Sequence, residues 1–156
     1  MKIEISFKNQ KVNQKIKKIV TKVVNLVCKD MNIKHKDFEL SVLLVENEFM
    51  RELNMKYRNR DRYTNVLSFP QNNFSISNNS IMTNLLGDVV ISVEQIKEES
   101  ILYSKDFYEH FIHIFLHGFL HLLGYSHDCK ESAKSMETKE VKILSSLDIA
   151  DPYLIS

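Results

Sequence analysis

The stretch that decides the fold is HFIHIFLHGFLHLLGYSH, residues 110–127, which holds five of the six histidines of the chain. Its spacing is typical of an apolar α-helix, in which His117 and His121 lie one turn apart. Their imidazoles therefore project from the same face, with Cβ atoms about 5–6 Å apart. Gly124 accepts the left-handed conformation that often ends a helix, so we expect the helix to stop there. The chain can then turn back and bring His127 to the other two.

Three neutral imidazoles in this arrangement are a ligand set for zinc, which binds histidine nitrogens at about 2.0–2.1 Å. A lone histidine on an apolar helix usually packs or finds a hydrogen bond, but burying several in one stripe is costly unless their nitrogens are satisfied. The sequence therefore predicts one zinc ion per chain, held by His117, His121 and His127. Three protein ligands leave the fourth position open, as in a catalytic site. Cys129 is an alternative fourth ligand, although its charged neighbours favour an exposed loop thiol.

Length and composition indicate one ordinary globular domain over residues 1–156, with 44% hydrophobic and 26% charged residues. A net charge of +1 argues against a protein that coats nucleic acid by bulk charge, while local basic patches remain open. Cys28 and Cys129 have no disulfide-framework spacing, which favours a reducing compartment. The N-terminus lacks a secretory signal, and residues 111–125 are too short and too rich in histidine to span a bilayer. We expect a cytoplasmic protein without a membrane partner.

Apolar periodicity alternates between strands and helices along the chain. This order predicts an α/β (α+β) fold in which a mixed, four-stranded sheet packs with about five helices and the histidine helix is central. Pro70 limits the third strand to an edge or an end of the sheet. Ser104 is the expected cap of the histidine helix, and residues 71–84 are the expected loop. The expected strands are residues 2–7, 38–45, 66–69 and 85–92, and the expected helices are residues 11–29, 46–57, 93–103, 105–123 and 131–147.

The helix expected at residues 11–29 has a lysine-rich face. Such a face is more often solvated than used to contact RNA, and we favour the solvated alternative.

The spacing His-x-x-x-His-x-x-Gly-x-x-His is that of the metzincin proteases, which place a general-base Glu directly after the first histidine. Here that position is Gly118, so peptide hydrolysis is disfavoured. Three neutral ligands leave the charge of a metal ion undiminished, which favours an anionic phosphate substrate. An arginine with its planar fork of donors would assist, and residues 56–62 supply several candidates. Composition alone does not choose among them.

The stretch HGFLHLLGYSH, residues 117–127, closely resembles the signature of the bacterial endoribonuclease YbeY family of rRNA maturation factors. Two further stretches match that family in order: LNMKYR at 53–58 leading to TNVLSFP at 64–70, and LGDVVIS at 86–92. Together these cover most of the region from Leu53 to Glu140. The N-terminal third matches only in general pattern.

The resemblance implies a zinc-dependent endoribonuclease, specific for single strands, that acts in 3′-end maturation of small-subunit rRNA and in ribosome quality control. By position, His117, His121 and His127 would be the zinc ligands, and Arg58 the catalytic or RNA-binding residue. The implied partners are single-stranded RNA and the rRNA of the small subunit. Ribosomal proteins or a ribosome-associated GTPase are further candidates.

One departure concerns the residue before the third histidine, where the family usually has Asp and this chain has Ser126. If that Asp orients a ligand, its loss weakens metal affinity, unless Asp128 substitutes from the other side. His113, one turn before His117, is expected to be a packing or supporting residue.

Three questions stay open on the sequence alone. Either water or the RNA 2′-hydroxyl can attack phosphorus, and the product ends would tell them apart. Thr64, Asn65 and Ser68 can contact RNA or cap turns. A non-catalytic ribosome-assembly factor, in which zinc only pins the last helix, is the alternative from a different class of function.

Overall fold

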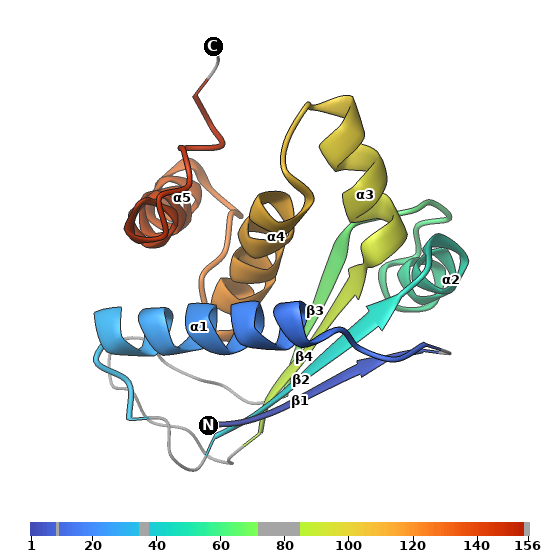
Figure 1. Ribbon diagram of the computed structural model, residues 1–156, viewed down its shortest axis with the longest axis horizontal. Coiled ribbons are helices and arrows are strands. Elements are labelled where there is room, and N and C mark those ends of the chain that lie inside the picture. Colours follow the sequence, from blue (N-terminus) through green and yellow to red (C-terminus); the bar gives the residue numbers. More distant parts are fainter. Residues whose placement is uncertain (9, 35–37, 72–84, 155–156) are drawn as a thin grey trace.

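The frame of the molecule is a four-stranded mixed sheet, as predicted (Figure 1). The computed structural model describes residues 1–8, 10–34, 38–71 and 85–154. The strand order is β1-β2-β4-β3, in which β1, β2 and β4 run parallel and β3 pairs antiparallel with β4. The bounds are β1 (Lys2–Phe7), β2 (Glu39–Val45), β3 (Val66–Pro70) and β4 (Leu85–Ser92). The short strand that ends in Pro70 therefore occupies an edge, as expected from the missing backbone donor of proline.

The described part of the chain contains five helices (Figure 1). Helices α1 and α4 cover one face, α5 packs against both of them, and α2 covers the other face. Helix α3 continues directly from β4. The bounds are α1 (Gln14–Asp30), α2 (Asn47–Arg58), α3 (Val93–Leu102), α4 (Phe107–Leu122) and α5 (Lys130–Ser146). None of the helices in these ranges is long and apolar enough to cross a membrane.

Strand β2 contributes to two hydrophobic cores, because its side chains alternate between the two faces of the sheet. Its residues Leu40, Val42 and Leu44 point into the larger core beneath α1 and α4, while Val45 points into the smaller core beneath α2. Successive side chains alternate between the faces of the sheet, so a strand buried on both faces is apolar throughout. The histidine helix α4 sits at the centre of the larger core, which confirms its predicted position.

The sequence-based expectations were wrong about the N-terminal ends of two helices, α1 and α4. Helix α1 begins at Gln14 rather than Lys11, because the Asn13 side chain accepts the backbone N–H of Ile16 at 2.9 Å. Helix α4 is capped by Asp106 and not by Ser104, which adopts a positive φ of 53° in the preceding turn. A carboxylate is the better cap here because it accepts two backbone N–H groups and its charge complements the helix dipole.

Three further expectations concern the end of the histidine helix, the two cysteines and the loop at residues 71–84. Gly124 has φ +100° and follows Leu123, the C-cap of α4, so the helix stops at this glycine as predicted. Cys28 and Cys129 are both free. Of the loop expected at residues 71–84, positions 72–84 lie outside the described residues.

Candidate metal centre

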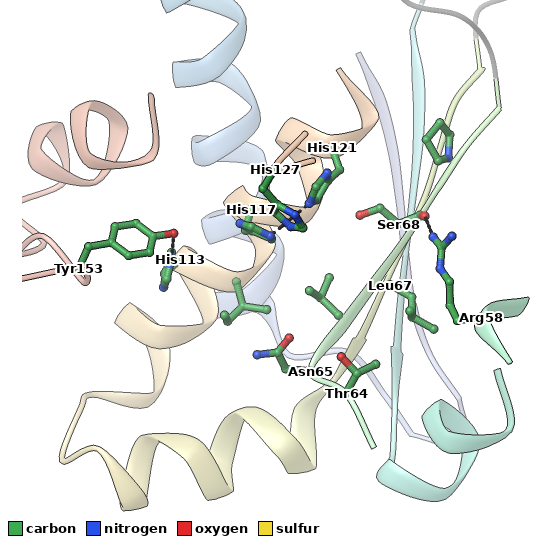
Figure 2. A pocket seen from close by; sticks show the side chains of 13 residues that line it. Arg58, Thr64, Asn65, Leu67, Ser68, His113, His117, His121, His127 and Tyr153 are labelled. Carbon is green, nitrogen blue, oxygen red and sulfur yellow. Dashed lines mark hydrogen bonds between the residues drawn. The ribbon is translucent and has the colours of Figure 1, made fainter. Parts of the chain in front are cut away.

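Helix α4 separates its apolar side chains from its histidines. Phe111, Phe115 and Phe119 are fully buried in the larger core, whereas His117 and His121 are only partly buried and line a cavity of about 660 Å³. This cavity lies between α4 and the edge strand β3 (Figure 2). The phenylalanines therefore fix the rotation of the helix, and that rotation places both imidazoles on the cavity wall.

Gly118 allows α4 to lie directly against the sheet. A Cβ atom built on Gly118 would be 2.9 Å from Cγ2 of Val66 and 2.9 Å from Cγ1 of Val89, and both distances are too short for real contacts. The Ser68 hydroxyl also donates to the Gly118 carbonyl at 2.8 Å, which ties β3 to the helix. The position where metzincins carry their general base thus faces the packed sheet, where a glutamate has no room.

The three predicted ligands converge on one place. One ligand atom from each of His117, His121 and His127 can be chosen so that all three lie within 4.8 Å of one another. The Nε2 atoms of His117 and His121 are 3.2 Å apart. Two nitrogens bound to a tetrahedral zinc ion at about 2.0–2.1 Å lie about 3.3 Å apart, so this spacing matches. His127 is exposed and comes from the segment that follows Gly124 (Figure 2).

Hydrogen bonds fix the tautomers of the two helical histidines. Nδ1 of His121 lies 3.0 Å from the Tyr125 carbonyl, which can only accept, so Nδ1 carries the proton and Nε2 has the lone pair. Nδ1 of His117 likewise donates to Oε1 of Glu140 at 2.7 Å. Each ring is therefore oriented by its outer nitrogen, an arrangement common to metal-ligating histidines.

This arrangement leaves two nitrogen lone pairs facing each other at 3.2 Å, which is repulsive unless a cation lies beside them. Burial lowers the pKa of His121 to about 4, which keeps this ring neutral and its Nε2 lone pair free for a cation. A divalent metal ion satisfies both lone pairs, and His127 is positioned to add a third nitrogen. The residues present thus fit the implied zinc ion.

Glu140 is the functional residue that the sequence analysis missed. It belongs to α5, is fully buried, and accepts hydrogen bonds from His117 and from the Tyr153 hydroxyl. Burial alone would raise its pKa, but these hydrogen bonds lower the pKa below its usual value, so Glu140 is ionised. The sequence contains a pattern that indicates this role. Met136, Glu140 and Leu144 share one face of α5, and a carboxylate on such an apolar face needs a partner.

His113 supports this network and is not a ligand. Its Nε2 atom is 3.3 Å from the Tyr153 hydroxyl and 3.7 Å from Oε1 of Glu140. Burial lowers the pKa of His113 to about 4, so the ring is neutral. This placement agrees with the supporting role expected from the sequence.

No hydrogen bond like those of His117 and His121 orients the ring of His127 among the described residues. Within the described part of the chain, neither Ser126 nor Asp128 makes a hydrogen bond with a ring nitrogen of His127. Cys129 caps α5 through Ser132 and is not among the ligand atoms that cluster at the site. Asp128 therefore does not replace the missing aspartate in this structure, and the fourth position carries no cysteine.

Arg58, the last residue of α2, lines the same cavity as the three histidines. Its Nη2 atom donates to the Ser68 carbonyl at 3.0 Å, which holds the guanidinium on the opposite side of β3 from the histidines (Figure 2). Lys56, Arg60 and Arg62, the other cations of this segment, do not line the cavity.

The polar residues of the Thr64–Ser68 segment also lie at the cavity, but two of them have structural bonds. Asn65 donates to Oε1 of Glu99 at 3.0 Å, and the Ser68 hydroxyl is bound to Gly118. Thr64 lines the cavity wall.

Comparison with known proteins identifies the family. The family model described as Endoribonuclease YbeY matches residues 2–148. The chain belongs to the endoribonuclease YbeY family. The YbeY endoribonuclease of Colwellia psychrerythraea is 44% identical over 120 residues, which cover 77% of this chain and 75% of that protein. The YbeY endoribonuclease of Agrobacterium fabrum is 42% identical over 115 residues, covering 74% of this chain and 67% of that protein.

A solved structure agrees with the fold of this YbeY family member. The solution structure of a Thermotoga maritima protein superposes with a TM-score of 0.55 at 20% identity, covering 98% of this chain and 99% of that one. At this identity the likeness concerns the fold alone. The YbeY family consists of endoribonucleases, so the expected enzyme class, acting on RNA phosphodiester bonds, is confirmed at the level of the family.

Proposed function

We propose that this chain is a zinc-dependent endoribonuclease, specific for single-stranded RNA, that acts in the cytoplasm in 3′-end maturation of small-subunit rRNA and in ribosome quality control. Membership of the YbeY family supports the endonuclease activity. The observation that carries the metal dependence is the pair of Nε2 lone pairs 3.2 Å apart, with both outer nitrogens already bonded. Ribosomal proteins and a ribosome-associated GTPase are the candidate protein partners.

His117, His121 and His127 would hold the zinc ion, which when bound supplies positive charge that stabilises the developing negative charge on a phosphate. Glu140 and the Tyr125 carbonyl keep the first two rings in the required orientation. The site offers no side chain at position 118, so the chain supplies no glutamate base there. The nucleophile is either water or the RNA 2′-hydroxyl.

Arg58 would neutralise charge on the non-bridging oxygens of the phosphate. One of its nitrogens is bonded to the Ser68 carbonyl, which leaves further N–H donors of the guanidinium fork for an anion. Because Arg58 is exposed at the end of α2, its side chain can reorient around the β3 edge without disturbing a packed core.

The test is cleavage of purified RNA. The metal-loaded protein should cut single-stranded RNA, spare duplex RNA and casein, and lose activity with a chelator. Arg58→Ala should lower kcat about 10²–10³-fold, the usual effect of removing one donor to developing charge, whereas Arg60→Ala should stay near wild type. Product ends with a 2′,3′-cyclic phosphate identify the 2′-hydroxyl as nucleophile, and direct 3′-hydroxyl and 5′-phosphate ends identify water.

One observation favours the alternative of a non-catalytic assembly factor, since the His117–Glu140 bond joins α4 to α5 and a metal there would also pin the last helix. The variants separate the two functions. If Arg58→Ala leaves ribosome maturation in cells intact while His117→Ala unfolds the protein, the metal is structural and the enzyme proposal fails.

A further inference from the structure

A second groove lies on the α2 face of the sheet, beside Arg58. Its volume is about 420 Å³, within the range of about 300–1,000 Å³ that is usual for ligand sites. Three aromatic rings line it, from Phe49, Tyr57 and Phe69, and we call it the aromatic groove. The rings of Tyr57 and Phe69 meet edge to face with centroids 5.2 Å apart. Tyr57 is 53% exposed, so much of this ring is available to a ligand.

Cations surround these rings. The Arg58 guanidinium carbon is 5.7 Å from the centre of the Phe69 ring, Lys56 is 5.2 Å from that of Tyr57, and the Lys8 ammonium is 3.5 Å from that of Phe49. Each aromatic ring of the groove thus has a positive charge within reach. The groove also contains Ser41 and Asp88, which can hydrogen-bond the edge of a planar ligand. Aromatic faces combined with cations are the means by which proteins hold unpaired bases and the adjoining phosphates.

The aromatic groove and the candidate metal centre share the edge strand β3. Ser68 points toward the histidine helix, where it bonds Gly118, while its neighbour Phe69 points to the opposite face and lines the groove. Arg58 connects the two sides, because it bonds the Ser68 carbonyl, lies over Phe69 and lines the metal cavity. Since β3 is the last strand of the sheet, a flexible chain can pass around it from one site to the other.

We propose that the aromatic groove binds an unstacked nucleobase of the RNA strand whose phosphodiester lies at the three histidines, and that Tyr57 is a specificity-determining residue. This inference rests on the proposed function. A base in a duplex is stacked on both faces and cannot enter the groove, and a duplex cannot bend around one strand. The groove therefore selects single strands, and Arg58, which lies over Phe69 and lines the metal cavity, connects the bound base to the phosphate at the three histidines.

The chain contains no tryptophan, which allows a direct test. Tyr57→Trp introduces a single reporter in the groove, and Tyr103→Trp introduces one at the end of α3, where Tyr103 is 58% exposed and outside both sites. Both variants are titrated, in chelator, with a short single-stranded oligoribonucleotide and with the same sequence as a duplex. The single strand should quench the fluorescence of Tyr57→Trp, and neither ligand should quench Tyr103→Trp.

Affinity supplies the second readout. Base stacking on an aromatic side chain accounts for about 1–3 kcal/mol, so Tyr57→Ala should weaken binding of the single strand about 5- to 150-fold. Tyr57→Phe and Tyr103→Ala should bind as wild type. Equal affinity of Tyr57→Ala and wild type, or equal quenching of Tyr57→Trp by duplex and single strand, overturns the proposal. Because no cleavage is measured, a protein that binds in this way but never cuts RNA would refute the proposed function and leave the groove standing.

Discussion

Replacing Glu140 tests the metal centre through a residue that would not itself touch the metal. Its carboxylate fixes the Nδ1 proton of His117 at 2.7 Å and also accepts from Tyr153. Removing an outer hydrogen-bond partner of a metal-binding histidine typically lowers metal affinity about 10–100-fold. We expect Glu140→Ala to reach the upper part of that range, because His117 then loses both its orientation and its negative partner.

Glu140→Gln should fall in the lower part of the range. The amide oxygen still accepts from His117, so the tautomer is kept, but the negative charge that strengthens the ligand is lost. The two variants should also differ in stability. Glu140→Ala leaves the partly buried Nδ1 donor of His117 without an acceptor, at about 1–3 kcal/mol, and adds a cavity, whereas the glutamine fills the same space.

The assay is zinc affinity at pH 7, measured by competition with a chromophoric chelator on variants shown to be folded. Glu99→Gln is the matched control, since the partly buried Glu99 carboxylate also accepts a hydrogen bond from a histidine, His110, which lies outside the predicted ligand set. The control should bind zinc as tightly as wild type. If both Glu140 variants also bind zinc with unchanged affinity, Glu140 does not hold His117 in the loaded protein and the argument from tautomers is wrong.

Three further perturbations have defined outcomes. Gly118→Ala should lower the free energy of unfolding in urea by about 1 kcal/mol, because crowding against Val66 outweighs the better helix propensity of alanine. Gly118→Glu should lower it further. An alanine variant as stable as wild type would show that Gly118 is not needed for close packing. Lys139 and Lys142 lower the pKa of Asp30 by hydrogen bonding, so this carboxylate stabilises the fold above about pH 4 and the contribution is lost as pH falls through its lowered pKa. The free energy of unfolding of Asp30→Asn should therefore be about 1–2 kcal/mol below that of wild type at pH 7, and the difference should shrink toward pH 2. A difference that does not change with pH would refute this role of Asp30. Zinc should raise the Tm of the wild-type protein in a concentration-dependent manner and a chelator should reverse this, and a Tm indifferent to zinc would count against a bound metal.

The sequence predicted the elements of the fold because their periods are strong. Residues 110–123 have a clear helical period that Gly124 ends, and Pro70 limits its strand to an edge or an end of the sheet. Helix starts were less certain, since Ser104 and Asp106 are both acceptable caps and only the path of the preceding turn decides between them. Sequence preferences identify the residues that can cap a helix, and tertiary packing determines which of them does so.

The candidate site also has a part that local sequence predicts and a part that depends on tertiary packing. The three histidines are close in sequence and one turn or one loop apart, so local geometry predicts that they meet. Glu140 is 23 positions from His117 and reaches it only because α5 packs on α4, a contact that no local rule gives. The side of β3 on which Arg58 lies is likewise set by the register of the sheet and the end of α2.

X-ray absorption at the zinc edge of the purified, zinc-loaded protein tests the central claim most directly. Three imidazole nitrogens and one exchangeable oxygen ligand at about 2.0–2.1 Å are expected, with one imidazole lost in each single His→Ala variant of His117, His121 and His127. A sulfur scatterer at about 2.3 Å, which would place Cys129 in the fourth position, or a spectrum unchanged by these substitutions, would contradict an open three-histidine centre.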